Sequence, residues 1–320
     1  MLLARLVISV FLFAAIAFGT GVASGQAYPT KPIRIISPGP GGDPDFAARL
    51  LAQAMSGPLG QQIIVENRPS GVIPGQVVSK APADGYTILI AGTSLWIGPF
   101  LEDAPYDPEA DFLPITLLTR SPNILYVHPS LPVKSVKELI ALAKAKPGEL
   151  NYGSGGTGTS THLSPEFFKH MAGVNIVRVR YNSGSQRVNA LLGGEVQVQF
   201  ESAAVLAHVK TGKLRALAVT SPEPSLLAPG LPTIAATGVP GYAWEGMMGM
   251  FAPAKTPAPI ITRLNQEFVR ALNNADVKPR FFSAGEDVVG SSPEQFAATL
   301  KSEMARLGKL IKDAGLREAK

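Results

Sequence analysis

The sequence of 320 residues contains no cysteine, and this absence excludes whole classes of structure and chemistry. The chain can form neither disulfides nor a zinc or iron–sulfur site held by thiolates, and it has no cysteine nucleophile. Histidine is scarce as well, with four residues that lack metal-ligand spacing. His162 and His170 are eight positions apart, and a helix would separate them by about 12 Å. We therefore expect no metal centre.

Charged residues are also few, at 17% of the chain, whereas apolar residues make up 46%. That balance argues against general disorder, and the length fits two domains of roughly 100–200 residues each. The 29 lysine and arginine residues exceed the 24 acidic residues only slightly, and no basic run is interleaved with aromatic residues. We therefore expect no nucleic-acid partner.

The N-terminus carries an apolar run from Leu6 to Phe18, which follows Arg5 and precedes small and polar residues. A membrane-spanning helix needs about 20 apolar residues, and this run has 13. Gly25 and Ala27 supply the small residues that a signal peptidase requires at −3 and −1. The pattern predicts a signal peptide over residues 1–27, cleaved near Ala27, and a soluble mature protein in the periplasm of a Gram-negative source.

From Lys31 onward, short β-branched runs alternate with longer helical patterns, which is typical of α/β units around a mainly parallel sheet. Asp43 is predicted to be the N-cap of the first helix, with Pro44 at N1 and Gly57-Pro58 at its end. Strands are expected at 33–36, 62–65, 87–91, 115–118, 124–127, 150–152, 176–181, 196–200, 214–219 and 247–251. Further helices are expected at 136–145, 161–171, 186–192, 203–210, 260–273, 277–284 and 293–314.

Two glycine-rich loops each connect a strand to a helix, one from Pro38 to Gly42 and the other from Gly153 to Gly158. A helix N-terminus presents unpaired N–H groups and about half a positive charge, so glycines there allow a carboxylate or phosphate to approach the backbone. If the loops belong to different domains and face each other, they predict an anion-binding cleft. A structural turn stays the alternative for each loop.

The loop at Gly153 also matches the dinucleotide fingerprint G-x-G-x-x-G. That fingerprint needs an acidic residue about 20 positions further on, where this chain has Val177-Arg178-Val179-Arg180. Gly158-Thr159 likewise stands where a phosphate-binding P-loop needs Gly-Lys. We therefore expect no nucleotide cofactor.

A catalytic alternative would use Ser154 or Ser160 as the nucleophile and His162 as the base. The chain has neither a G-x-S-x-G elbow nor an H-E-x-x-H motif, and these hydroxyl residues are equally suited to cap a helix. Asp45 and Glu201 could pair as acid and base, but solvated or capping carboxylates are commoner. The residues favour binding without catalysis, with a secreted hydrolase as the alternative.

Ordered motifs recur along the whole mature chain. They are YPTKPIR at 28–34, PGGDPDFAAR at 40–49, VENRP at 65–69, DGYT at 84–87, PYDP at 105–108, LNYGS at 150–154, LLGG at 191–194, GKLRALAVT at 212–220 and GVPGY at 238–242. Together they resemble the Bug family, the extracytoplasmic solute receptors of tripartite tricarboxylate transporters.

The resemblance implies an α/β periplasmic-binding-protein fold, in which two α/β domains are joined by two crossing strands and close on a small carboxylate in the cleft between them. We expect domain 1 at residues 28–125 and 249–320, and domain 2 at residues 126–248. The crossings would lie near Ile124–Val127 and Met247–Phe251, so that the C-terminal helices return to domain 1.

The resemblance also implies a ligand site. In the family, backbone amides of the first loop and of the loop after the fifth strand hold carboxylates, often through ordered water. Asp45 matches the aspartate position of the family, and other polar residues lie on segments that line the cleft. The expected ligand-binding residues are Gly41, Gly42, Asp45, Thr93, Ser94, Ser154, Gly155, Thr157, Thr159, Ser160, Tyr181, Asn182, Glu201 and Ser202.

The implied function is that of an extracytoplasmic solute-binding protein, not an enzyme. It would capture a small organic anion and deliver it to the permease subunits of a tripartite tricarboxylate-type transporter. A ligand-binding co-sensor for a signalling system stays open beside the hydrolase. A monomer is the expectation from the family.

Several positions depart from the family pattern. Asp43 stands where a small hydroxyl residue is frequent, so it adds an anion beside the anion site; as a helix cap it would compete with the ligand for N–H donors. Glu201 replaces a frequent aspartate, and Leu95 and Trp96 replace smaller polar residues. Trp96 and Trp244 are equally suited to be core anchors. These departures suggest a ligand with a hydroxyl, amine or amide at one end.

Overall fold

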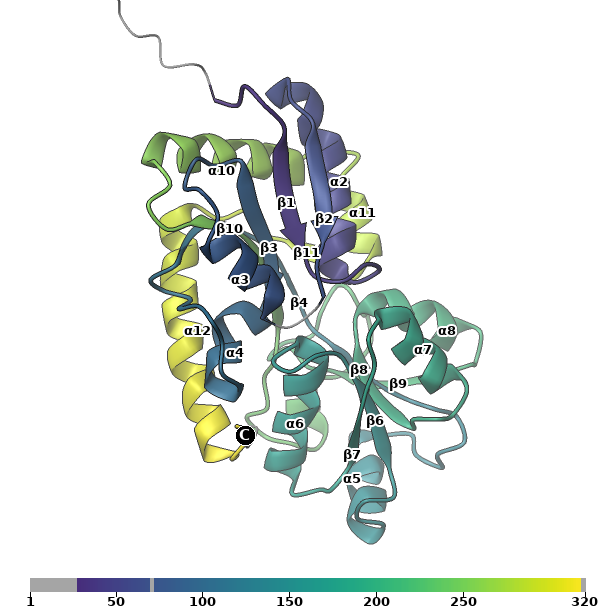
Figure 1. Cartoon of the computed structure of the whole chain (residues 1–320). Helices are drawn as coiled ribbons and strands as arrows, with labels where there is room; N and C mark the ends of the chain where they lie inside the picture. Colours follow the sequence, from purple (N-terminus) through teal and green to yellow (C-terminus); the bar gives the residue numbers. More distant parts are fainter. Residues whose placement is uncertain (1–27, 70–71, 318–320) are drawn as a thin grey trace, which may run out of the picture. The chain divides into compact units, whose positions relative to one another are not determined.

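The computed structural model describes residues 28–69 and 72–317, so the expected signal peptide at 1–27 lies outside the described residues. From Lys31 the described chain forms one compact unit that contains two β-sheets (Figure 1). No helix in this described part is both long and apolar enough to cross a membrane.

The first sheet is mixed and has six strands in the order β11-β4-β10-β3-β1-β2. Strand β1 is parallel to β2 and β3, whereas β10 is antiparallel to β3 and β4, and β11 is antiparallel to β4. The strands are β1 (Ile33–Ser37), β2 (Ile63–Asn67), β3 (Thr87–Gly92), β4 (Phe112–Ser121), β10 (Gly246–Pro253) and β11 (Asp287–Val288). Strand β3 is a nearly continuous buried apolar run because it lies inside the sheet.

The second sheet has five strands in the order β7-β6-β8-β5-β9. Strand β6 is parallel to β7 and β8, and β5 is antiparallel to β8 and β9. The strands are β5 (Ile124–Val127), β6 (Asn151–Ser154), β7 (Val177–Arg180), β8 (Val198–Glu201) and β9 (Arg215–Val219).

Helices accompany both sheets (Figure 1). Those with the first sheet are α2 (Asp43–Leu59), α3 (Ile73–Ser79), α4 (Ser94–Leu101), α10 (Ala258–Leu272), α11 (Lys278–Ser283) and α12 (Pro293–Asp313). Those with the second are α5 (Val136–Ala145), α6 (Ser160–Ala172), α7 (Gly184–Leu192), the short 3₁₀ turn η1 (Ala203–Val205), α8 (Leu206–Lys210) and α9 (Ile234–Thr237). Both α10 and α12 pack on β4, so the C-terminal helices return to the first sheet as expected.

Local sequence explains where the best-defined helices begin. Ser135 caps α5 by accepting the N–H of Glu138, as the pattern predicts. At the start of α12, Ser292 and Gln295 form a capping box, and a proline occupies the first turn. Such caps satisfy N–H groups that have no partner inside the helix.

The start of α2 differs from the prediction. Gly42 is the N-cap, since the N–H of Phe46 donates to its carbonyl oxygen, and no side chain caps the helix. Asp43 is therefore the first helical residue, and its carboxylate does not occupy the N–H groups of its own helix. The prediction was wrong by one position because an N-cap needs an extended backbone, which Gly42 adopts as readily as aspartate.

Two further differences have physical reasons. Helix α2 continues through Pro58 to Leu59, because a proline in the last turn removes one hydrogen bond without breaking the preceding turns. Helices α3 and α4 were not predicted, since both contain glycine and proline. Tertiary packing overrides that weak propensity, as at Gly75 of α3, where a methyl group would lie 2.6 Å from the Tyr106 ring.

Both tryptophans are core residues, each 1% exposed. Trp96 packs against Phe251 and Phe296, with ring centroids 6.0 and 6.4 Å away, and so joins α4, β10 and α12. Trp244 packs against Phe167 of α6 at 5.4 Å. The structure therefore supports the role of core anchor for both tryptophans.

The chain passes between the sheets next to the ends of β4 and β10. Strand β5 pairs only within the second sheet over its whole length, and β10 pairs only with strands of the first, so neither is itself a crossing segment. The first passage is at residues 122–123, and the return comes before Gly246. The domain limits at 125/126 and 248/249 stay a prediction.

Gly249 lies where β10 meets α12, and a methyl group there would lie 2.2 Å from Cζ of Phe296. We expect Gly249→Ala to lower the free energy of unfolding by about 1–3 kcal/mol, the usual cost of overpacking. Gly92→Ala on neighbouring β3 is the matched control, because its methyl group would find ordinary contact at 3.5 Å. Urea unfolding of both variants checks this, and equal losses of stability would contradict it.

Candidate functional site

Loops from both sheets meet at the starts of α2, α4, α6 and α7. A methyl group built on Gly184 would lie 3.5 Å from the carbonyl oxygen of Gly41, and one built on Gly158 would lie 3.4 Å from Cα of Ser94. Each glycine-rich loop thus approaches an element of the other sheet. The loops follow the carboxyl ends of parallel strands, which is where open α/β sheets bind ligands.

Asp45 stabilises the first glycine-rich loop, residues 38–42, through hydrogen bonds. Its Oδ2 accepts the N–H of Gly41 at 3.1 Å, and its Oδ1 accepts from Asn67 at 2.9 Å and lies 2.9 Å from Nη2 of Arg49. Burial alone would raise the pKa of Asp45, but these hydrogen bonds outweigh it and lower the pKa. The Gly41 N–H, which the resemblance assigned to a ligand, is engaged by Asp45 in this conformation.

The second loop is held by its own hydroxyl groups. The buried Ser154 Oγ accepts from Nε of Arg178 at 2.7 Å. Thr159 Oγ1 donates to the Gly156 carbonyl oxygen at 2.7 Å, and Thr161 Oγ1 accepts from the Gly155 N–H at 3.0 Å. These bonds fix the shape of the loop before α6. Thr157 lies in the same loop and is buried.

Ser160 and His162 make contacts that do not form a nucleophile–base pair. Ser160 Oγ accepts from Trp244 Nε1 at 2.8 Å and from Asn123 Nδ2 at 3.0 Å. His162 Nδ1 accepts the N–H of Gly158 at 3.1 Å. Burial lowers the pKa of His162 to about 3, with further lowering by Arg178, Lys169 and Arg180. Such an imidazole is neutral at pH 7 and a weak base.

Arg187 is a functional candidate that sequence reasoning missed. Its Nε donates to Glu201 Oε1 at 2.6 Å, and the two side chains are 14% and 8% exposed. Methyl groups built on Gly155 and Gly184 would lie 3.4 Å from its Nη1 and 3.6 Å from its Nη2. The guanidinium therefore lies beside the start of α7 and the loop before α6. The sequence signal that could have placed Arg187 near a helix start was Ser183, which caps α7 one turn before Arg187.

Two carboxylates, Glu201 and Asp43, act electrostatically on this guanidinium, and Asp43 in turn acts on Glu286. The Asp43 side chain is exposed to solvent. Desolvation by the surrounding protein nevertheless raises the pKa of Asp43 to about 6; the charge of Glu201 adds to this rise, and the charge of Arg187 opposes it. Burial and then Asp43 raise the pKa of Glu286 to about 8, against hydrogen bonds from Thr119 and Ser121. Across the described residues, no group of three or more His, Asp or Glu is placed to hold a metal ion.

The remaining expected site residues differ in burial and in hydrogen-bond partners. Thr93 is buried, and its Oγ1 has no hydrogen-bond partner among the described residues; Ser94 begins α4. Tyr181 donates to Glu195 at 2.7 Å. The exposed Asn182 N–H donates to Gln186, and the Ser202 carbonyl oxygen accepts from Tyr126.

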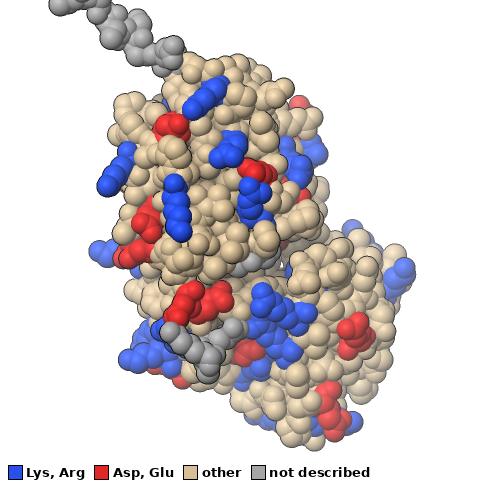
Figure 2. All heavy atoms as spheres, viewed as in Figure 1, with Lys and Arg blue, Asp and Glu red and all other residues tan. Residues whose placement is uncertain are grey.

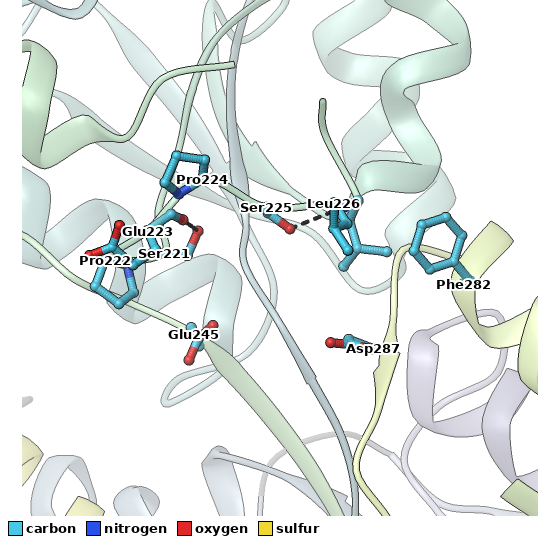
Figure 3. Close-up of a pocket in the computed structure, with 10 residues that line it drawn as sticks. Ser221, Pro222, Glu223, Pro224, Ser225, Leu226, Glu245, Phe282 and Asp287 are labelled. Atoms are coloured by element: carbon cyan, nitrogen blue, oxygen red, sulfur yellow. Dashed lines mark hydrogen bonds between the residues drawn. The ribbon is translucent and has the colours of Figure 1, made fainter. Parts of the chain in front are cut away.

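Two hollows lie away from these residues. Figure 3 shows the larger, of about 270 Å³, which is lined by the segment 221–227 together with Glu245, Phe282 and Asp287. Leu226 and Phe282 there are 84% and 48% exposed. The second hollow, of about 210 Å³, shares Pro222 and Glu245 with the first. Neither contains a residue that the sequence analysis expected at the ligand site.

Surface charge is mixed on the face that Figure 2 shows, where lysine and arginine are interspersed with aspartate and glutamate. This arrangement agrees with the scattered basic residues of the sequence.

A family model described as "Tripartite tricarboxylate transporter family receptor" matches residues 47–316. The chain belongs to this family. The protein BugT of Bordetella pertussis is 34% identical over 318 residues, which cover 97% of this chain and 98% of that protein. The resemblance to the Bug family is thereby confirmed.

Solved structures agree with this assignment. Rpa4515 of R. palustris, solved with adipate, has 35% identity and a TM-score of 0.83, with 90% of this chain and 98% of that chain covered. MatC from Rhodopseudomonas palustris, solved with bound malate, has 26% identity and a TM-score of 0.83, with 89% and 100% covered. The fold is the two-domain α/β fold of periplasmic binding proteins, and the family consists of solute-binding receptors.

Glu286 should make stability depend on pH. Because its pKa is about 8 in the folded protein and near 4.5 when unfolded, the folded state binds the proton more tightly, and that stabilisation is lost as pH rises from about 4.5 through about 8. We expect Glu286→Gln to gain stability over the parent between pH 5 and pH 9, by on the order of 2–4 kcal/mol. Denaturant unfolding across this range measures the gain.

The surface residue Glu109, changed to Gln, is the control, and it should follow the parent at every pH. Parallel pH profiles of the Glu286→Gln variant and the parent would show that the Glu286 carboxyl is not held in its protonated form.

Proposed function

We propose that this protein is a periplasmic solute receptor, exported by its N-terminal segment, which captures a small organic carboxylate between its two domains and delivers it to a tripartite tricarboxylate-type permease. The observation that carries the proposal is the position of Arg187, which lies beside glycine loops at the junction of the domains. Arg187 thus joins the residues that the resemblance assigned to the ligand.

Arg187 is oriented to hold a carboxylate. Glu201 accepts from its Nε and fixes the plane of the guanidinium, so that Nη1 and Nη2 are turned toward Gly155 and Gly184. A guanidinium edge of this kind binds a carboxylate through two parallel hydrogen bonds. Each charge-assisted bond contributes about 1.5–3 kcal/mol. Two such bonds with N–H donors of α6 and α7 are enough for micromolar affinity, about −8 kcal/mol.

The same contacts explain how a ligand would favour the closed form. Gly184 approaches Gly41, and Gly158 approaches Ser94, so the loops of the two domains are in contact. A ligand that touches both sets of loops stabilises the closed arrangement and shifts the population toward it. That closed form is the state we expect a permease to recognise.

The contacts of the serine residues weigh against the hydrolase alternative. Ser154 is bonded to Arg178, and Ser160 is bonded to Trp244 and Asn123. His162, with a pKa of about 3, would be a poor general base at neutral pH. Binding for a signalling system would use the same site.

We expect Arg187→Met to weaken the binding of carboxylates by about tenfold or more, since the variant loses charge-assisted hydrogen bonds. The measurement is thermal unfolding of the mature protein against mono-, di- and tricarboxylates, including malate and adipate, followed by calorimetry of each acid that binds. A ligand at about 100 times its dissociation constant adds roughly 2.7 kcal/mol of stability.

The matched control is Arg306→Met, which removes an exposed arginine from α12. It should bind each acid as the parent does. If Arg187→Met keeps full affinity, the ligand site does not include Arg187. If changing Leu226 or Phe282 to Ala abolishes binding, the ligand site is the hollow that these two residues border.

A further inference from the structure

Two large apolar side chains line the hollow of Figure 3 and are open to solvent. Leu226 is 84% exposed and lies in the loop that follows β9, and Phe282 is 48% exposed and lies on α11. A single exposed apolar residue needs no explanation, but apolar groups that share one hollow and have polar neighbours are typical of a surface that binds a partner.

The rim of this hollow is acidic. The charged residues that line it are Glu223, Glu245 and Asp287. Arg120 lies 3.7 Å from Glu245 and partly balances its charge. Glu223 and Asp287 are exposed, and neither forms an ion pair with another described residue. The chain as a whole has a formal net charge of +5, so this rim departs from the average surface, and it is complementary to lysine or arginine.

The hollow suits a protein side chain better than a free solute. Sites for small molecules usually bury about 70–90% of the ligand surface, whereas Leu226 and Phe282 are themselves largely open to solvent. An apolar side chain of a partner would cover both of them. A lysine or arginine next to that side chain would meet the carboxylates of the rim.

The walls of the hollow come from both sheets. The segment 221–227 follows β9, whereas Phe282 and Asp287 belong to α11 and β11. The turn between α11 and β11 also approaches the second sheet, since a methyl group built on Gly285 would lie 2.7 Å from the backbone nitrogen of Ala203 in η1. A motion that separates the two domains would therefore change the hollow. A partner that fills it distinguishes the closed form from an open one.

We propose that this hollow is the docking surface for the permease, which places an apolar side chain against Leu226 and Phe282 and a lysine or arginine against Glu223 and Asp287. This inference rests on the proposed function and adds the surface through which the receptor delivers its ligand. The apolar contact supplies most of the affinity, because buried aromatic and aliphatic anchors dominate protein interfaces. The acidic rim speeds association and makes it sensitive to salt.

The test separates ligand delivery from ligand binding. Right-side-out membrane vesicles from cells that lack the gene for this chain receive purified receptor, and uptake of the radiolabelled acid that thermal unfolding identifies is followed against receptor concentration. Leu226→Ala combined with Phe282→Ala should raise the half-saturating receptor concentration about tenfold or more, while calorimetry gives the parent's affinity for the acid. Ile64→Ala combined with Met171→Ala, at exposed positions away from the hollow, is the matched control.

The rim is tested through its charge. Glu223→Gln combined with Asp287→Asn should also raise the half-saturating receptor concentration, and the rise should shrink as salt screens the parent's rim. Glu109→Gln combined with Asp276→Asn removes two exposed carboxylates elsewhere and should follow the parent at every salt concentration.

The outcomes separate this inference from the proposed function. Parent-like half-saturation in both hollow variants, with normal uptake by the parent, overturns the docking surface and leaves the receptor function standing. Weaker binding of the acid by the Leu226 and Phe282 variant makes the hollow part of the ligand site and also overturns docking. A parent that binds no acid, or that binds one but drives no uptake, overturns the proposed function together with this inference.

Discussion

The candidate site depends on how β4 and β10 pair, because these strands lead the chain into and out of the second sheet. Their pairing ends at Ser121 and Gly246, and the passage beyond is tied by hydrogen bonds from Asn123 and Trp244 to Thr220. The Trp244 indole then donates to Ser160 at the start of α6. The passages between the sheets thus hold the start of α6 directly and set its position relative to the first sheet.

The charged groups near the starts of α2 and α7 are unfavourable to bury in their ionised forms. Bringing three carboxylates and one guanidinium into a crowded, partly dry region disfavours their ionised forms unless each is paired. Arg187 satisfies Glu201, whereas Asp43 and Glu286 respond with raised pKa values. Perturbed pKa values of this kind are typical of functional sites.

The sequence predicted the elements that local pattern determines. Strand β5 and helix α5 have the expected bounds, and the pattern of strand, glycine-rich loop and helix located both glycine-rich loops. Helix α4 was missed because Gly98 and Pro99 lie inside it and only its packing makes it helical. Arg187 and Glu286 could not be found in this way, since the pairing of Arg187 with Glu201 and of Glu286 with Thr119 depends on tertiary contacts across 14 and 167 positions.

A crystal structure of the protein with the ligand it retains on purification tests the central claim most directly. The account predicts a small molecule whose carboxylate contacts Nη1 and Nη2 of Arg187. A ligand in the hollow bordered by Leu226 and Phe282, or one that leaves Arg187 without contact, would contradict it.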